Sequence, residues 1–201
     1  MLRMVINNYG WYPCPSFGPF NPYQVEGPKT ISYEIIEQLK GKTPDWILIP
    51  VGSACLLSGI WKGFRDFLKI GIIDSMPKFA ANLSMMFQDF PFLDRFSAAA
   101  SAGFKGVEFL FPYDHPAEEV AKAAKDAGVE VALFNLPPGD WTKGERGFAA
   151  MPGRQNDFDE ALNKAMFYAE ALGCNRLHCM AGLVTENMDL AEARATYISN
   201  L

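Results

Sequence analysis

RFSAAASAGFKGVEFLFP, residues 95–112, contains one complete passage from a helix to a strand. The pattern predicts a helix over Phe92 to Ala102, which ends at Gly103 because glycine readily adopts the conformation that closes a helix. The run GVEFLFP then predicts a short buried strand. A helix, a glycine and an apolar strand in this order are typical of proteins in which helices connect the strands of a parallel sheet.

The same unit recurs along the C-terminal part of the chain. Further apolar strands are predicted from Lys78, at 130–138 and at 176–182. Further helices are predicted from Pro116 to Ala127, from about Asn156 to Leu172, and over 187–201. Because the strands are apolar on both faces, they predict a parallel sheet covered by helices. Four consecutive βα units are the periodicity of the first half of a (β/α)8 TIM barrel.

The N-terminal part has a different organisation. A helix is predicted from Lys29 with Gly41 as its stop, and the run WILIPV at 46–51 predicts a short buried strand. A glycine-flanked turn at 52–59 and a second helix follow. A turn in this position can hold a phosphate on backbone amides, but a purely conformational role for its glycines is the interpretation that the spacing favours.

The stretch DSMPKFAANLSMMF, residues 74–87, separates the two patterns. The helical pattern before it ends through IDSMPK, and the βα rhythm begins in PKFAANL. We therefore predict two parts in this α/β chain. Residues 1–77 form a strand-loop-helix fragment, and residues 78–201 form the half barrel.

Composition excludes several classes of function. The chain is 49% hydrophobic and 20% charged, and its net charge of -5 with no basic cluster argues against nucleic-acid and membrane-surface partners. No apolar run approaches the roughly 20 residues that span a bilayer, and no signal-peptide core is visible, which predicts the cytoplasm. Four scattered cysteines without a CxxC pair predict reduced thiols.

Polar side chains occur at the predicted strand ends, where a parallel barrel carries its chemistry. Asn82 follows the first predicted strand, Glu108 lies within the second, Asn135 lies at the end of the third and His178 lies in the fourth. The asparagines could instead satisfy loop backbone, and a histidine in an apolar strand is more often a hydrogen-bonded core residue than a ligand. Glu108 is the hardest to explain structurally, because a carboxylate among apolar neighbours must find a partner or hold a proton.

The loop PPGDWTKGERGFAAMPGR, residues 137–154, is long and rich in glycine, proline and charge, as substrate-covering loops often are. Arg146 and Arg154 could bind a carboxylate there through paired hydrogen bonds. They could equally be solvated surface charges.

KFAANLSMMF, GFKGVEFLFPYD, ALFNLPPGDWTKGERG and AEALGCNRLHCMAG resemble, in order, the start of the hydroxypyruvate isomerase and 2-oxo-tetronate isomerase family. These enzymes are xylose-isomerase-like TIM barrels. The resemblance covers nearly all of residues 78–201. It implies an isomerase that interconverts hydroxypyruvate and tartronate semialdehyde, or a related 2-oxo acid, through an enediolate.

The same resemblance implies a divalent metal, Mg2+ or Mn2+. In this family the acidic metal ligands and the catalytic glutamates come from strands five to eight, which residues 1–201 do not include. The resemblance therefore identifies no metal ligand and no catalytic residue here, and we expect this chain by itself to be inactive. The residues that remain as candidates for substrate binding are Asn82, Glu108, Asn135, Arg146, Arg154 and His178.

NPYQVEGPKTISYEI and PDWILIPVGSACLLSGIWKGF resemble the middle of threonine synthase, a pyridoxal-phosphate enzyme. Its glycine-rich turn holds the cofactor phosphate, which implies Gly52 and Ser53 as cofactor-binding residues. The two residues after them carry Cβ atoms that would obstruct a phosphate. The Schiff-base lysine of that family belongs to an upstream segment, and Lys29 and Lys62 match other positions. We therefore expect pyridoxal phosphate not to be bound.

Three functions are compatible with these patterns. The chain can be a piece of an isomerase of small 2-oxo acids, or a fragment of a pyridoxal-phosphate lyase. It can also be a non-catalytic fusion product that associates with itself, because an open half barrel exposes apolar faces and unpaired strand edges.

Overall fold

The computed structural model describes residues 22–49, 55–185 and 188–201. The chain divides into two compact units, Met1–Phe79 and Ala80–Leu201. The boundary predicted after residue 77 falls close to this division.

The first unit is built on two packed helices. Its described elements are η1 (Pro22–Val25), α2 (Glu26–Gln38), β1 (Trp46–Leu48) and α3 (Cys55–Lys69). Ile36 from α2 shares a core with Ile60 and Phe64 from α3. The first helix starts earlier than predicted and includes Pro28, which is tolerated in a first turn because no intrahelical bond is lost there. Strand β1 matches the start of the predicted strand.

Close approach of the two helices requires a glycine. A Cβ atom built on Gly63 would lie 1.8 Å from Ser32 Oγ, so a larger residue would push α3 away from α2. Ion pairs bridge the same helices, since Lys29 Nζ lies 2.6 Å from an Asp66 carboxylate oxygen and Lys62 pairs with Glu26.

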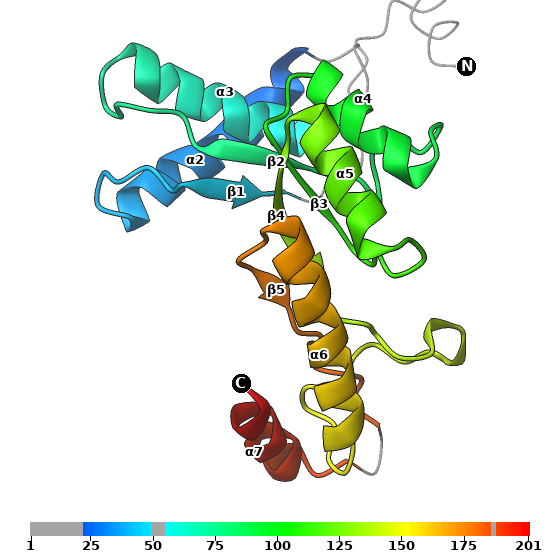
Figure 1. The fold of residues 1–201 in the computed structure, drawn as a ribbon. Helices are drawn as coiled ribbons and strands as arrows, with labels where there is room; N and C mark the ends of the chain where they lie inside the picture. The colour runs from blue at the N-terminus through cyan, green and yellow to red at the C-terminus, as the bar shows by residue number, and fades with distance from the viewer. Residues whose placement is uncertain (1–21, 50–54, 186–187) are drawn as a thin grey trace, which may run out of the picture. The chain divides into compact units, whose positions relative to one another are not determined.

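The second unit alternates strands and helices. Its elements are β2 (Lys78–Asn82, whose first two residues belong to the first unit), η2 (Phe92–Asp94), α4 (Arg95–Ser101), β3 (Gly106–Phe109), α5 (Ala117–Ala127), β4 (Glu130–Asn135), η3 (Trp141–Lys143), α6 (Gln155–Leu172), β5 (Leu177–His178) and α7 (Leu190–Asn200). Strands β2 to β5 pair in sequence order, all parallel. Helix α5 packs between α4 and α6 (Figure 1). This is the predicted parallel α/β half barrel of four βα units.

Two elements differ from the predicted bounds. The helix predicted over 92–102 begins as a short 3-10 segment, η2, before continuing as α4. Strand β5 contains two residues instead of the seven predicted at 176–182. The reason is that the chain after His178 pairs with the loop that follows β4, through an antiparallel bridge between Gly147 and Ala181.

Aromatic side chains fill the core of the second unit. Phe109 of β3 is 2% exposed and packs edge to face against Phe92 and Phe96, with ring centroids 5.3 and 5.8 Å away. Its ring also stacks on Phe134 of β4 at 5.9 Å. The sheet is therefore joined to its first helix by aromatic contacts centred on Phe109.

Among the described residues, no helix combines the length and the apolar character needed to cross a membrane. Cys174 and Cys179 are free thiols, and burial raises the pKa of both. Neither thiol is therefore activated as a nucleophile.

Candidate functional site

Asn82 and Glu108 form a buried pair at the ends of β2 and β3. The parallel register places the two residues opposite each other, so their side chains extend from the same face of the sheet. Asn82 Nδ2 donates a hydrogen bond to Glu108 Oε1 at 2.9 Å, and the residues are 7% and 9% exposed. The Oδ1 atom of Asn82 accepts from the Ser84 backbone N–H at 3.0 Å, which fixes the direction of the amide.

Glu108 carries an unusual carboxyl group. Within the described part of the chain, Asn82 is its one hydrogen-bond partner, and no cation lies within ion-pair distance. Burial raises the pKa of Glu108, and the hydrogen bond from Asn82 offsets part of that rise. The group therefore holds a proton at higher pH than an ordinary carboxyl does, and can donate as well as accept hydrogen bonds.

Asn135 and His178 form a second pair at the ends of β4 and β5. Their side chains meet at 3.2 Å between Asn135 Oδ1 and His178 Nδ1, and Asn135 Nδ2 contacts Met180 Sδ at 3.8 Å. In the neutral ring, an oxygen acceptor at Nδ1 favours the tautomer with its proton there, in which Nε2 is the acceptor. His178 is exposed in this structure and is not part of the core of the second unit.

Hydrogen bonds between side chains and the backbone connect the strand ends. Tyr113 OH donates to the Asn135 carbonyl oxygen at 2.7 Å, which connects the segment after β3 to the end of β4. Ser84 Oγ accepts from the Leu110 N–H at 2.9 Å, which connects the segments after β2 and β3. The polar groups of all four strand ends are thereby held on one hydrogen-bonded frame.

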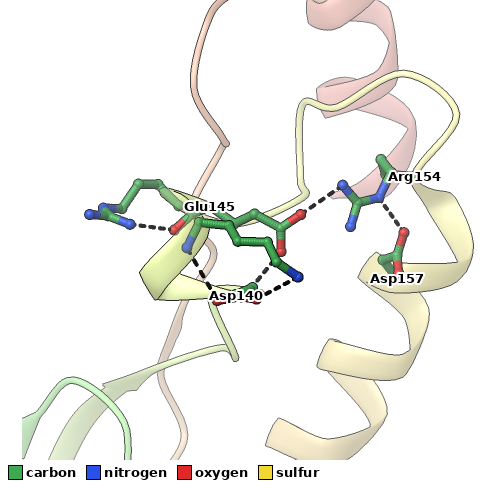
Figure 2. A network of polar contacts seen from close by, with 6 residues as sticks. Asp140, Glu145, Arg154 and Asp157 are labelled. Carbon is green, nitrogen blue, oxygen red and sulfur yellow. Dashed lines mark hydrogen bonds and ion pairs between the residues drawn. The ribbon is translucent and has the colours of Figure 1, made fainter.

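Arg154 belongs to a network of charges within the loop after β4 (Figure 2). Glu145 accepts from the Asp140 backbone N–H at 2.6 Å and from Arg154 Nη1 at 3.0 Å, while Arg154 Nε pairs with Asp157. The Asp140 N–H and then Arg154 hold the pKa of Glu145 below its ordinary value. Arg154 thus joins the loop to the start of α6.

Arg146 is held differently. Its guanidinium lies over the ring of Trp141, 3.5 Å from the centroid. Its Nη1 donates to the carbonyl oxygens of Trp141 at 3.2 Å and of Glu145 at 2.7 Å. Trp141 in turn packs edge to face on Phe111, just after β3, at 5.5 Å. The two arginines predicted together therefore have separate environments.

The loop is docked on the segment that follows β5. The Ala149 N–H donates to the Met180 carbonyl at 3.2 Å, and the Gly182 N–H donates to the Arg146 carbonyl at 3.2 Å. Gly147 has a φ of 98°, and a Cβ atom on it would lie 2.1 Å from Met180 O. Only glycine fits this contact, because a side chain would meet both backbone strain and backbone atoms.

Replacing Gly147 with alanine is expected to destabilise the second unit by about 1–3 kcal/mol, the range for a residue forced into a sparsely populated conformation. The clash with Met180 should also free the loop. Urea unfolding measures the first effect and limited proteolysis within 137–154 the second. Gly144 to alanine is the matched control, because Gly144 also has a positive φ, of 89°, but a Cβ there meets nothing within 4 Å. Equal protease sensitivity in the two variants would contradict the docking.

The described residues do not form a metal site by themselves. Among residues 22–49, 55–185 and 188–201, no group of three or more His, Cys, Asp or Glu side chains is placed to hold a metal ion. Glu108 and His178 are the carboxyl and imidazole groups at the strand ends, and each is bonded to an asparagine.

The predicted cofactor residues Gly52 and Ser53 lie outside the described residues. Among the described residues, Lys29 does not fit a Schiff-base role. The ion pairs with Asp66 and Glu26 raise its pKa, whereas such a lysine needs a lowered one. Lys62 is also paired with Glu26.

Sequence reasoning missed several residues that shape the site. Tyr113, Trp141, Glu145 and Met180 contact the predicted residues. Trp141 and Glu145 lie in the loop that composition had singled out, so an aromatic and an acidic residue beside the two arginines were the available signal. Nothing in the local pattern pointed to Tyr113 or Met180.

Comparison with known proteins finds that a different family model matches each part of the chain. Residues 96–201 match the family model of the xylose isomerase-like TIM barrel. Residues 1–84 match the model of pyridoxal-phosphate dependent enzymes.

Individual relatives are similar to the C-terminal part. The 2-oxo-tetronate isomerase of Cupriavidus necator is 54% identical over 126 residues, which are 63% of this chain and 48% of the relative. The hydroxypyruvate isomerase of Escherichia coli is 44% identical over 126 residues, 63% of this chain and 49% of the relative. A crystal structure described as AP endonuclease, family 2, from Brucella melitensis has 52% identity and a TM-score of 0.60, covering 62% of this chain and 48% of that one. This chain thus spans about half the length of these relatives.

Proposed function

This chain belongs to the xylose isomerase-like TIM barrel family, and we propose on that basis that its second unit lines the substrate site of a barrel isomerase acting on a small 2-oxo acid. One observation carries the proposal. Neighbouring strand ends pair Asn82 with Glu108 and Asn135 with His178, at the edge of the sheet where parallel barrels bind substrates. The relatives named 2-oxo-tetronate isomerase and hydroxypyruvate isomerase support an isomerase function.

The proposed substrate is hydroxypyruvate or a related 2-oxo acid. In its isomerisation a proton leaves C3, an enediolate forms across C2 and C3, and a proton adds to C2 as C3 becomes the aldehyde. The hydroxyl proton moves from the C3 oxygen to the C2 oxygen. The enediolate oxygens need hydrogen-bonding groups while they carry charge.

The residues of this chain would hold those oxygens. Glu108 would donate a hydrogen bond to one oxygen when it holds its proton, which burial favours, and Asn82 keeps the carboxyl in place. His178 accepts from the substrate hydroxyl through Nε2, while Asn135 holds its ring. The base that removes the C3 proton is not assigned to residues 1–201.

The purified 201-residue chain is expected to turn over no hydroxypyruvate, with or without Mg2+ or Mn2+. The reason is that the resemblance assigns the metal ligands and catalytic glutamates to strands outside these residues. Isomerase turnover is measured as the consumption of hydroxypyruvate and the appearance of the aldehyde product. Robust metal-dependent turnover by this chain alone would overturn the expectation.

The substrate-lining role is tested by adding the missing strands. The half of the Cupriavidus necator 2-oxo-tetronate isomerase that this chain does not match is mixed or co-expressed with it. We expect a co-eluting complex with isomerase activity that neither piece has alone. A stable complex without activity would count against the proposed function. A chain that assembles only with itself would favour the non-catalytic alternative, for which the exposed Phe167 and Ile198 are the structural argument, at 58% and 66%.

A further inference from the structure

We propose that Arg146 is the residue that binds the substrate carboxylate, and that Arg154 serves only to hold the loop. This inference deepens the proposed function and rests on it. The sequence treats the two arginines alike, since both lie in the same loop. Their contacts separate them.

One edge of the Arg146 guanidinium is fixed and the other is available. Its Nη1 donates to two backbone carbonyls, and its flat face lies on Trp141. In the part of the chain that the structure describes, no group accepts a hydrogen bond from its Nε or Nη2. A guanidinium held in this way presents two N–H groups in a fixed geometry, which suits a carboxylate. Little side-chain freedom remains to be lost on binding.

Arg154 has no such capacity. Its Nε pairs with Asp157 and its Nη1 with Glu145, so two carboxylates already surround one positive charge. The local sum is one negative charge, which repels an anionic substrate. The ring of Phe148 lies 4.6 Å from the guanidinium carbon and covers a face of it.

The backbone of Arg146 is also attached to the strand ends. Its carbonyl oxygen accepts from Gly182, and the next residue, Gly147, packs on Met180. Met180 in turn contacts Asn135. On the other side, Trp141 packs on Phe111, three residues after Glu108 along the chain. The loop that carries Arg146 is therefore joined to the segments that follow β3 and β5.

A pair of probes isolates the carboxylate. Hydroxypyruvate and dihydroxyacetone share the hydroxymethyl ketone and differ in that a carboxylate replaces a hydroxymethyl group. Binding to the 15N-labelled 201-residue chain is followed by NMR titration, with the Trp141 indole N–H as a local signal. We expect the wild-type chain to bind hydroxypyruvate more tightly than dihydroxyacetone.

Arg146→Met should weaken hydroxypyruvate binding by about tenfold and leave dihydroxyacetone binding within about twofold, as removal of one charged hydrogen-bonding partner predicts. Methionine keeps a long stem over the Trp141 ring, so the indole signal reports whether the loop is intact. Arg146→Lys should bind hydroxypyruvate more tightly than Arg146→Met but less tightly than the wild type, because lysine keeps the positive charge and lacks the paired N–H groups of the guanidinium. Arg154→Met should leave the preference for the carboxylate unchanged.

The outcomes separate the two levels of inference. In the assembly with the complementary half of the Cupriavidus necator enzyme, a wild-type chain that binds neither probe would remove the proposed function, and this inference with it. Binding of both probes with no selective loss in Arg146→Met would overturn the role of Arg146 and leave the proposed function standing. A selective loss of hydroxypyruvate binding in Arg154→Met, with the Trp141 signal unchanged, would show that Arg154 and not Arg146 binds the carboxylate.

Discussion

Replacing Phe109 with alanine is expected to lower the free energy of unfolding by about 3–5 kcal/mol, the range for removal of a buried aromatic ring. The ring is 2% exposed and contacts Phe92, Phe96 and Phe134, so its loss leaves a cavity between the sheet and its first helix. Domains are typically stable by only about 5–15 kcal/mol. The variant should therefore be close to unfolding at room temperature, which urea titration monitored by circular dichroism measures.

Phe167 to alanine is the matched control for this prediction. It removes the same atoms from α6, where the ring is 58% exposed. A surface substitution of this kind usually changes stability by within about 0.5 kcal/mol. Similar losses in the two variants would mean that the aromatic cluster around Phe109 does not form the core described above.

Replacing Glu108 with glutamine should change how stability depends on pH. Burial raises the folded-state pKa of Glu108 above its ordinary value of 4.5. The folded chain therefore binds this proton more tightly than the unfolded chain does, and the contribution is fully present below the unfolded pKa. It is lost as pH rises through the folded pKa. Glutamine stays neutral and keeps an oxygen that can accept from Asn82.

The expected result is a difference between the two proteins that changes with pH. As pH rises above the ordinary carboxyl value of 4.5, wild-type stability should fall relative to Glu108→Gln, and the melting temperatures of both proteins measure this difference. Replacing Glu145 with glutamine should change the pH dependence of stability in the opposite direction. The pKa of Glu145 is lowered, so its contribution is present above the unfolded pKa and is lost as pH falls. A Glu108 variant that behaves like the Glu145 variant would show that Glu108 is not a proton-holding group.

Most of the second unit was predictable because its signals are local. The helix predicted to end at Leu172 does so, with Gly173 in a left-handed conformation. The strand predicted from residue 130 occurs as β4, although it stops at Asn135. In such segments the periodic apolar residues and the residue that ends the element lie within a few positions of each other, so nearby residues are sufficient to predict the element and its end.

That the candidate residues lie along one edge of the sheet was predictable, and which of them pair was not. Polar residues at the carboxyl ends of parallel strands must lie along one edge, which is how Asn82, Glu108, Asn135 and His178 were found. Which of them pair depends on register and side-chain direction across strands far apart in the sequence. The prediction that Gly52 and Ser53 hold a phosphate stays a prediction, since both lie outside the described residues.

By itself, the sequence determined the order of strands and helices, the parallel sheet and the residues worth testing, because periodicity and helix stops are properties of neighbouring positions. Only the tertiary structure decided that β5 is short, that His178 is exposed and that Arg154 forms ion pairs with Glu145 and Asp157. It also showed that Nε and Nη2 of Arg146, beside Trp141, have no hydrogen-bond acceptor among the described residues. The physical reason is that hydrogen bonds and burial are made between residues that the fold brings together, and a local pattern contains no record of those distances.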